Sequence, residues 1–576
     1  MATSALKIAL TNRSPDAAVP CRYPAGTIRI SALSNTTKAH PLSFSQSSTN
    51  YEATRFRPTR AFGSNRVSGS GDPAFDVVIV GAGIIGLTIA RQFLLGSNLS
   101  VAIVDAAVPC AGATGAGQGY IWRVHKIPGS DKWELAMRSH QLWEEMAESI
   151  TIQGMDPLLE LGWKKTGSML VGRTEEDCLA LRKKVENLVD AGLGAKFLSS
   201  DELMAEEPSL NLGKEGGAAF MPDDCQIDAR RAVAFIEKAN RAFAAEGRYA
   251  EFFYEPVTGL LRSESSGEVE AVQTSKTTLR SKKAVIIAAG SWTGSLMHDI
   301  LKDSEIELDF PVKPRKGHLL VLENFKSFKV NHGLMEAGYV NHESATLSST
   351  TDPGNKSDAN TASISMTATM DMSGRLVLGS SRQLVGFDTE IDESIIDRIW
   401  DRASEFFPQL KEASLRELSE SREVRVGLRP YMPGGKPVIG PVPGLPMTFF
   451  AAGHEGEGLS LALGTAEMIL NMVLESPHKA RKGQEQGSLQ GAVESEKTLT
   501  VGVVPRKVAR EEIDLNESAK KQGLMTDEEF QAILDDVNRM EDDTAVVAEG
   551  LDLASRVVGE SEVAEEGNRS ESQARE

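Results

Sequence analysis

Three glycines and one aspartate have the types and the spacing to bind a dinucleotide. Gly81, Gly83 and Gly86 form the pattern G-x-G-x-x-G directly after an apolar run at 77–80. The first glycine permits a tight turn, the second lets the backbone approach a pyrophosphate, and the third lets a helix pack against the strand. Asp105 ends the next apolar run, where a carboxylate can accept hydrogen bonds from a ribose. The pattern therefore predicts a dinucleotide site.

A strand, a helix and a second strand must hold these residues in place. The β-branched run at 77–80 is typical of a parallel strand buried on both faces. A helix is expected from about Ile84 to Leu95, and its first N–H groups, near Ile84 and Ile85, would face the phosphates. The alternatives are a glycine-rich turn that binds nothing and a membrane span. An apolar stretch of about fourteen residues is too short for the span.

Three later segments are also rich in glycine and small residues. One is the loop 111–119, the second is a buried strand that ends at Gly290, and the third is the turn 454–458, which leads into an apolar helix. A second strand–turn–helix junction this late predicts that both ends of the domain hold the same ligand. The residues expected to contact the ligand in these segments are Ala113, Thr114, Gly115, Gly117, Gln118, Gly119, Ala289, Gly290, Gly453, His454, Gly456, Gly458 and Leu459.

From Phe310 onwards the pattern changes to strands that alternate or run without a helical period. Segments 314–322, 364–370 and 375–383 predict an antiparallel sheet, with a turn at 371–374. The fold class is therefore predicted as α/β, with a Rossmann-like ligand-binding domain on a parallel sheet and a second antiparallel-sheet α+β domain. The first domain is expected to use approximately 75–160, 215–300 and 425–478, and the second 161–214 and 301–424, with a polar surface insertion at 341–363.

The two ends of the chain have a different composition from the part between them. Residues 1–70 contain nine Lys or Arg but two acids, and they are rich in Ser and Thr. This composition predicts an organelle transit peptide, for a chloroplast or alternatively a mitochondrion. The segment 479–576 is acidic and expected to be mostly disordered. It is either simply solvated or binds a protein partner through a short helix beginning near Thr526.

Overall composition excludes several classes of protein. The net charge of −19 argues against a nucleic-acid surface, and 41% hydrophobic residues are enough for a large core. Four cysteines without a C-x-x-C pair predict neither a disulfide framework nor a zinc site. We expect no metal and no transmembrane segment.

Together these motifs resemble the D-amino-acid oxidase superfamily of FAD-dependent oxidoreductases, over about 75–475. The motifs occur in the family's order, and they are DVVIVGAGIIGL with Asp105, ATGAGQGY at 113–120, AVIIAAGSW at 284–292, PRKGHLLVL at 314–322, GLRPYMPGGKPVIG at 427–440 and AAGHEGEGLSLALGTAEMI at 451–469. The chain departs from the family at Gly434, where an Asp is usual, and in the turn after His454, where glycine oxidases carry an Arg.

The resemblance implies noncovalent FAD and a small amine or amino-acid substrate. In such enzymes a hydride passes from carbon to the flavin, and the resulting imine is hydrolysed. Arg429 matches an arginine that holds the substrate carboxylate, so Arg429 and His454 are the catalytic candidates, with His318 as a weaker one. His454 could equally cap the following helix, and Arg429 could form an ion pair. The alternative function is a flavoprotein that has lost turnover and acts in binding or assembly.

Overall fold

The computed structural model describes residues 72–475, except 303, 307, 309, 340–361 and 419–420. All the described residues belong to one compact unit. The predicted transit peptide, the acidic tail and most of the predicted insertion therefore lie outside the described residues.

The first sheet has eight strands, and its central part is parallel, as predicted. Strands β18, β11, β1, β2 and β8 lie next to one another in that order, each parallel to its neighbour. The antiparallel strands β17, β10 and β9 extend the sheet beyond β18 and β11. The strands are β1 (Ala74–Val80), β2 (Val101–Asp105), β8 (Tyr249–Phe253), β9 (Val257–Arg262), β10 (Val269–Thr274), β11 (Thr278–Ile287), β17 (Val438–Pro441) and β18 (Thr448–Ala452).

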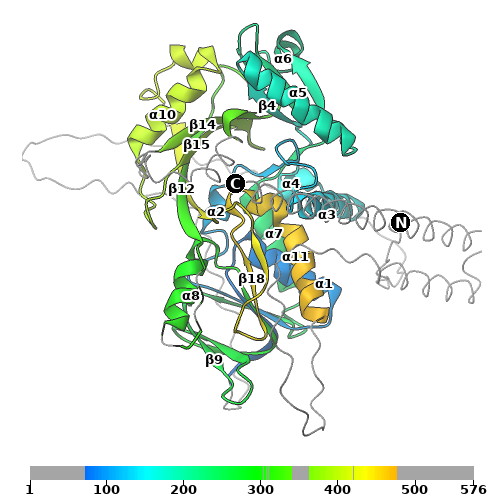
Figure 1. Ribbon diagram of the computed structural model, residues 1–576, viewed down its shortest axis with the longest axis vertical. Helices are drawn as coiled ribbons and strands as arrows, with labels where there is room; N and C mark the ends of the chain where they lie inside the picture. Colours follow the sequence, from blue (N-terminus) through cyan, green and yellow to red (C-terminus); the bar gives the residue numbers. More distant parts are fainter. Residues whose placement is uncertain are drawn as a thin grey trace, which may run out of the picture. The chain divides into compact units, whose positions relative to one another are not determined.

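Helices cover both faces of this sheet (Figure 1). On one face, Val77 and Ile79 pack into a core with four helices, and on the other, Val78 and Val80 pack with α8 and β10. Because successive side chains of a strand point to opposite faces, the β-branched run of β1 serves both cores. The helices are α1 (Ile84–Gly96), α3 (Trp133–Ile152), α7 (Ala229–Arg241), α8 (Thr293–Leu301) and α11 (Gly458–Glu475).

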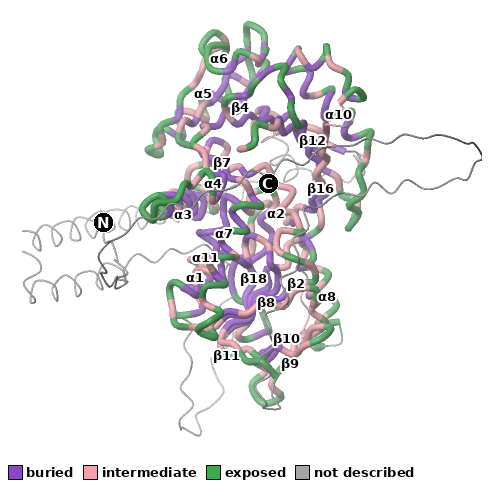
Figure 2. Tube along the Cα trace, turned by 180° about the vertical axis from the view of Figure 1, so that it is seen from behind, coloured by how far each residue is buried: buried purple, intermediate pink, exposed green. Residues whose placement is uncertain are grey.

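The residues Glu455–Glu475 that include α11 are long and apolar enough to cross a membrane. In this fold α11 is a core helix, because it packs against α1 and α3 and most of its residues are buried. Figure 2 shows the buried residues gathered around the strands of the sheets and the helices that pack on them.

The second sheet also has eight strands, in the order β16–β12–β15–β14–β13–β4–β6–β5. Its core faces α10 (Glu393–Ser404), and α5 (Glu175–Asp190) and α6 (Ser200–Glu206) pack at its other end (Figure 1). The strands are β4 (Ser168–Gly172), β5 (Lys196–Ser199), β6 (Gly217–Met221), β12 (Lys313–Leu322), β13 (Gly333–Glu336), β14 (Ser363–Met370), β15 (Leu376–Arg382) and β16 (Arg422–Tyr431).

Three sequence predictions about this sheet need correction. The sheet is not wholly antiparallel, because β13 and β4 run parallel. Strand β6 was expected in the first domain, after residue 215, but it pairs with β4 and β5 in the second sheet. Strand β16 likewise pairs with β12, so residues 425–431 belong to the second sheet. Pairing between segments far apart in the chain leaves no local pattern, so strand periodicity could not assign these strands to a sheet.

Short elements connect the two sheets. Strands β3 and β7 form a separate two-stranded sheet, and α2 lies between α7 and β16, contacting both. A side chain on Gly427 of β16 would lie 2.8 Å from Ala116 Cβ, so α2 packs closely on β16. The short elements are α2 (Ala113–Ala116), β3 (Tyr120–Ile121), α4 (Pro157–Leu161), β7 (Cys225–Gln226) and the 3₁₀ turns at Gly290–Trp292, Pro408–Glu412 and Glu455–Glu457.

Candidate functional site

The three glycines of the turn after β1 have two different roles: two are required by packing within the protein, and one leaves space for a ligand. Gly81 has φ +115°, and a Cβ there would lie 2.3 Å from Ala288 O, while a Cβ on Gly86 would lie 1.9 Å from Gly81 O. The protein itself therefore requires both glycines. A Cβ on Gly83 would meet only Thr114 Oγ1, at an ordinary 3.4 Å. Packing does not explain Gly83, which fits its predicted role of letting a pyrophosphate approach the backbone.

Asp105 shapes this turn as well as facing the site. Its Oδ2 accepts a hydrogen bond from Ala82 N at 2.6 Å, and its Oδ1 accepts one from Ala107 N at 2.7 Å. A carboxylate has about four acceptor positions, so ribose hydroxyls can still bind. Asp105 therefore holds the glycine turn in the shape that the ligand needs.

The predicted ligand-binding segments converge at one edge of the first sheet. This is expected because the carboxyl ends of parallel strands meet at the same edge. Ile84 N donates to Thr114 Oγ1 at 3.2 Å, which joins α1 to α2. A Cβ on Gly117 would lie 3.0 Å from Leu459 Cδ1, so the loop after α2 also reaches α11. The remaining predicted residues stand at the end of β11 or β18 or on the turn that follows, namely Ala289, Gly290, Gly453, His454, Gly456 and Gly458.

Two predicted residues have roles set by the protein's own packing. Gly119 has φ +86°, and a Cβ there would lie 1.8 Å from Ile227 O, so close chain contact requires this glycine. Ile85 is partly buried and packs against the core of the first domain.

Arg429 lies where the second sheet meets the turn 453–458. Its register partner on β12 is Arg315, so both side chains leave the same face of the sheet. The guanidinium lies over Gly317, where a Cβ would be 2.1 Å from Arg429 Nη1, and a Cβ on Gly456 would be 3.8 Å from Arg429 Cδ. The absence of side chains at both glycines makes room for the arginine and keeps the space beside it open.

Arg429 and Arg315 differ in their partners. Arg315 forms an ion pair with Glu455 and stacks 4.0 Å from the centroid of the Tyr431 ring. Arg429 Nη1 donates to Ser381 O at 2.9 Å, and among the described residues no carboxylate lies within 4.0 Å of its guanidinium. A half-buried guanidinium without a counter-ion can take a bidentate carboxylate from a ligand. Among the described residues Arg429 therefore forms no ion pair, in contrast to the alternative considered from the sequence.

His454 does not have the position expected of a proton-transfer residue. The side chain is buried, and Nε2 lies 3.0 Å from Thr465 Oγ1 of α11. Burial lowers the pKa of His454 to about 4, so the ring is neutral at pH 7. The ring therefore connects the turn to α11. This structural role is close to the helix-capping alternative considered from the sequence.

His318 is also held by structural contacts. Asp392 N donates to Nε2 at 3.3 Å, which leaves the ring proton on Nδ1 to donate to Ser381 Oγ at 3.0 Å. Leu320, two residues along the same strand, belongs to the core under α10. His318 thus faces away from Arg429, and it is not a site residue.

Sequence reasoning missed a group of buried polar atoms between β14, β15 and the loop after α2. Gln118 was predicted, but Thr367 and Ser380 were not. Gln118 Nε2, Thr367 Oγ1 and Ser380 Oγ are buried without a hydrogen-bond partner in the protein. A Cβ on Gly379 would lie 2.6 Å from Thr367 Oγ1 and 3.8 Å from Gln118 Oε1, so Thr367 and Gln118 converge there. Unpartnered buried polar atoms indicate a place for a polar ligand or water.

A second missed feature is the buried carboxylate of Glu457. His125 Nε2 lies 3.1 Å from Glu457 Oε1, Lys132 Nζ donates to Oε2 at 2.6 Å, and Lys126 pairs with Oε1. Burial alone would raise the pKa of Glu457, but these partners hold it well below its usual range. The network fixes the turn 453–458 beside Arg429. Its sequence signal, a histidine and two lysines at 125–132, lies too far from the turn in the chain to be recognised.

Comparison with known proteins agrees with this geometry. Residues 76–472 match the FAD dependent oxidoreductase family. Hydrogen cyanide synthase subunit HcnC of Pseudomonas protegens is 25% identical over 438 residues, which is 70% of this chain and 93% of that protein. Glycine oxidase of Pseudomonas aeruginosa is 26% identical over 406 residues, 69% of this chain and 94% of that protein. The crystal structure of glycine oxidase from Geobacillus kaustophilus gives a TM-score of 0.57 at 21% identity, covering 70% of this chain and 95% of that one.

The chain therefore belongs to the FAD dependent oxidoreductase family, and its cofactor is FAD. The predicted α/β fold class is confirmed by the likeness to glycine oxidase. The residues at the edge of the first sheet suit FAD, because Gly83 leaves space at the start of α1 and Asp105 faces the same turn.

Proposed function

We propose that this protein oxidises the C–N bond of a small amino acid whose carboxylate is bound by Arg429. The observation that carries the proposal is the half-buried guanidinium of Arg429, beside the cofactor turn, without a carboxylate partner among the described residues. Relatives are named as glycine oxidases, which supports an amino-acid substrate. FAD supplies the hydride acceptor when it is bound.

In this proposal the protein's own residues bind both ends of the substrate and so fix its orientation. Arg429 binds the two carboxylate oxygens through parallel N–H groups, which fixes one end of the substrate. Gln118 and Thr367, whose polar atoms lack protein partners, are in place to hold the amine end. His454 is buried against α11, so we assign it no proton transfer, and an amine that binds in its neutral form needs no dedicated base.

The test is anaerobic reduction of the flavin, which is measured as the loss of its yellow absorbance. Glycine derivatives, D-amino acids and imino acids would be compared with the matching amines that lack a carboxylate. We expect reduction by at least one carboxylate-bearing compound and weaker reduction by its decarboxylated counterpart. Amines reduced as fast as amino acids would refute the role of Arg429, and no reduction by either class would refute C–N oxidation.

We further propose that FAD is bound noncovalently, since no cysteine could be aligned with a flavin-attachment position. Acid precipitation should release all the yellow chromophore into the supernatant, whereas chromophore retained on the chain would show a covalent bond.

We also propose that residues 1–70 direct the protein to a chloroplast, on the basis of their basic, Ser-rich and acid-poor composition. A fluorescent reporter fused to residues 1–75 should enter the plastid. A reporter found in mitochondria or left in the cytosol would contradict the assignment.

A further inference from the structure

Three side chains of metal-binding types meet between helix α3 and strand β7. A ring nitrogen of His140, a carboxylate oxygen of Glu144 and the Sγ of Cys225 all lie within 4.8 Å of one another. His140 and Glu144 are four residues apart on α3, so they share one face of that helix. We expected no metal from the sequence, because Cys225 is distant in the chain and only the fold brings β7 to this face.

The ring of His140 is buried, and its hydrogen-bonding capacity is not used. His140 is 3% exposed, and among the described residues its Nε2 has no hydrogen-bond partner. Nδ1 lies 3.6 Å from Glu144 Oε2, which is longer than a hydrogen bond. Nε2 therefore lacks the bond that a buried polar atom normally forms. A metal ion is a partner that such a ring nitrogen commonly takes.

The charges around the three donors suit a divalent cation. Arg123 pairs with Asp224 at 3.2 Å. The exposed Lys165 pairs with Glu144 Oε1 at 3.2 Å and leaves Oε2 available. Burial raises the pKa of the Cys225 thiol to about 12, so a metal must replace its proton, which passes to solvent. A Cys225 thiolate would bring the charge of the group to −2, because it consists of three carboxylates and two cations, namely Glu144, Asp223, Asp224, Arg123 and Lys165.

We propose that His140, Glu144 and Cys225 bind a zinc ion through one nitrogen, one oxygen and one sulfur atom. Zinc accepts all three types of ligand, whereas magnesium and calcium prefer oxygen. Its bonds to these atoms are about 2.0–2.3 Å long, so donors within 4.8 Å of one another can reach one ion through small side-chain movements. Water takes the fourth position from the side of Glu144, whose side chain is 37% exposed.

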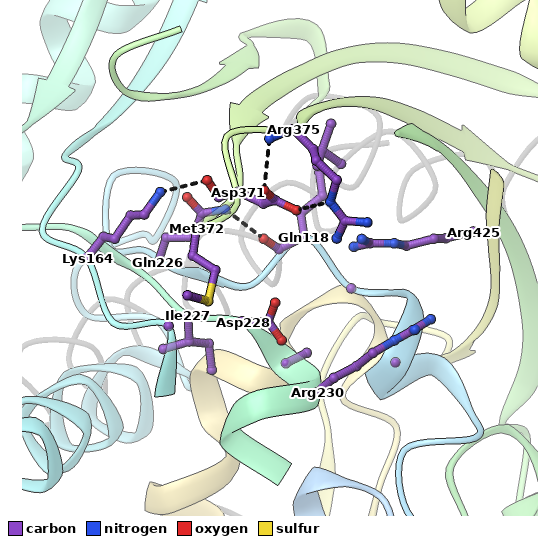
Figure 3. A pocket seen from close by; sticks show the side chains of 15 residues that line it. Gln118, Lys164, Gln226, Ile227, Asp228, Arg230, Asp371, Met372, Arg375 and Arg425 are labelled. Atoms are coloured by element: carbon purple, nitrogen blue, oxygen red, sulfur yellow. Dashed lines mark hydrogen bonds and ion pairs between the residues drawn. The ribbon is translucent and has the colours of Figure 1, made fainter. Parts of the chain in front are cut away.

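The zinc ion would stabilise the strand that positions the cofactor loop. The residue after Cys225, Gln226, donates from Nε2 to Gln118 O at 3.1 Å, as Figure 3 shows. Cys225 and Gln226 point to opposite sides of β7, because successive side chains of a strand alternate. The ion would therefore hold β7 on the side away from Gln118 and would not contact the substrate. The site does not depend on the substrate proposed for Arg429.

Zinc binding to the full-length FAD-bound protein tests the site. The protein is treated with a chelator and then titrated with Zn²⁺ in competition with a chromophoric chelator. We expect one zinc ion per chain, a dissociation constant on the order of 1 µM or lower, and no competition from Mg²⁺. X-ray absorption at the zinc edge should show one sulfur ligand at about 2.3 Å together with nitrogen and oxygen ligands. No bound zinc, or zinc without a sulfur ligand, would overturn the proposal.

Variants identify the residues that bind the ion. Cys225→Ser should raise the dissociation constant for zinc at least about a hundredfold and remove the sulfur signal. Cys178→Ser, which changes a free buried thiol of α5, should leave both unchanged. Glu144→Gln should raise the constant at least about tenfold, and Glu148→Gln, at an exposed position four residues further along α3, is its matched control. Unchanged zinc affinity in Cys225→Ser or in Glu144→Gln would contradict the assignment.

A second set of variants applies if Cys225→Ser does not retain flavin and fold, since Cys225 is fully buried. The sulfur ligand is then identified by elimination, through Cys21→Ser, Cys110→Ser and Cys178→Ser. Each of these variants should keep the sulfur signal and the zinc affinity of the unchanged protein. Loss of the sulfur signal in any of them would show that zinc binds elsewhere and would overturn the proposal.

Discussion

The two ends of strand β16 use arginine in different ways. At one end, Arg425 joins Arg375 and Glu423 in an ion-pair network that connects β16 to the turn before β15. At the other end, Arg429 donates to a backbone carbonyl and has no carboxylate partner among the described residues. A half-buried charge without a counter-ion costs free energy that a bound anion offsets. The difference therefore distinguishes an arginine that stabilises the fold from one that is available to a substrate.

The largest expected effect comes from removing Arg429. Arg429→Ala should lower kcat/KM roughly a thousandfold, about 4 kcal/mol, because a buried carboxylate would lose its paired charge. Arg429→Lys keeps the charge but loses the fork, and should cost about 2–3 kcal/mol, roughly thirty- to a hundredfold. Flavin reduction measured against substrate concentration gives both values. Arg425→Gln is the comparison, with an expected change below about threefold. Equal losses at the two positions would remove the distinction between the two ends.

The second prediction tests whether the cofactor lies at the end of the sheet that faces Arg429. Gly83→Ala should keep the fold, since the added methyl meets only Thr114 Oγ1 at 3.4 Å, but it should lower FAD affinity at least tenfold, about 1.4 kcal/mol. Gly86→Ala should instead prevent folding, because its Cβ would lie 1.9 Å from Gly81 O. FAD titration of the apoprotein and circular dichroism distinguish the two outcomes. Unchanged FAD affinity in Gly83→Ala would mean that no phosphate approaches this residue.

The third prediction concerns acid sensitivity near Arg429. The pKa of His454 falls from 6.5 to about 4 on folding because the ring is buried. Between these values the unfolded chain binds more protons, so the stabilisation present above pH 6.5 is lost as the pH falls toward 4. The full effect is on the order of 3 kcal/mol at about 1.36 kcal/mol per pKa unit.

Thermal unfolding from pH 7.5 to 5.0 measures this effect. The melting temperature of the wild-type protein should fall more steeply over this range than that of His454→Asn. His125, whose pKa is also lowered to about 4, remains as a second source of acid sensitivity in the variant. Parallel curves for the two proteins would show that His454 does not titrate as described.

The smallest expected effect is at the Arg425 end. Glu423→Gln removes the charge that holds Arg375 and Arg425, but the site is partly exposed, so we expect a loss of about 1 kcal/mol or less. For a chain of this size the melting temperature should fall by about 2 °C, with kcat/KM unchanged. A large loss of activity would indicate that this ion-pair network also positions the substrate.

Local sequence patterns were enough to predict the strand–helix–strand unit from β1 to β2. The strands and glycines of that unit lie within about thirty residues, and each glycine meets a local requirement for space or backbone angle. The predicted α1, from Ile84 to about Leu95, agrees with the observed Ile84–Gly96. Asp105 was predicted for the same reason, although its two hydrogen bonds to the turn were not.

Only the tertiary structure decided what depends on distant pairing. The sequence places Arg315 and Arg429 over one hundred residues apart, yet β12 and β16 set them opposite each other. Glu455 then neutralises one arginine and leaves the other available. In the same way, packing against α11 turned His454 from a catalytic candidate into a structural residue. Side-chain type and spacing determine which chemistry is possible, but the partner that each charge meets is set by contacts between distant segments, which no local pattern encodes.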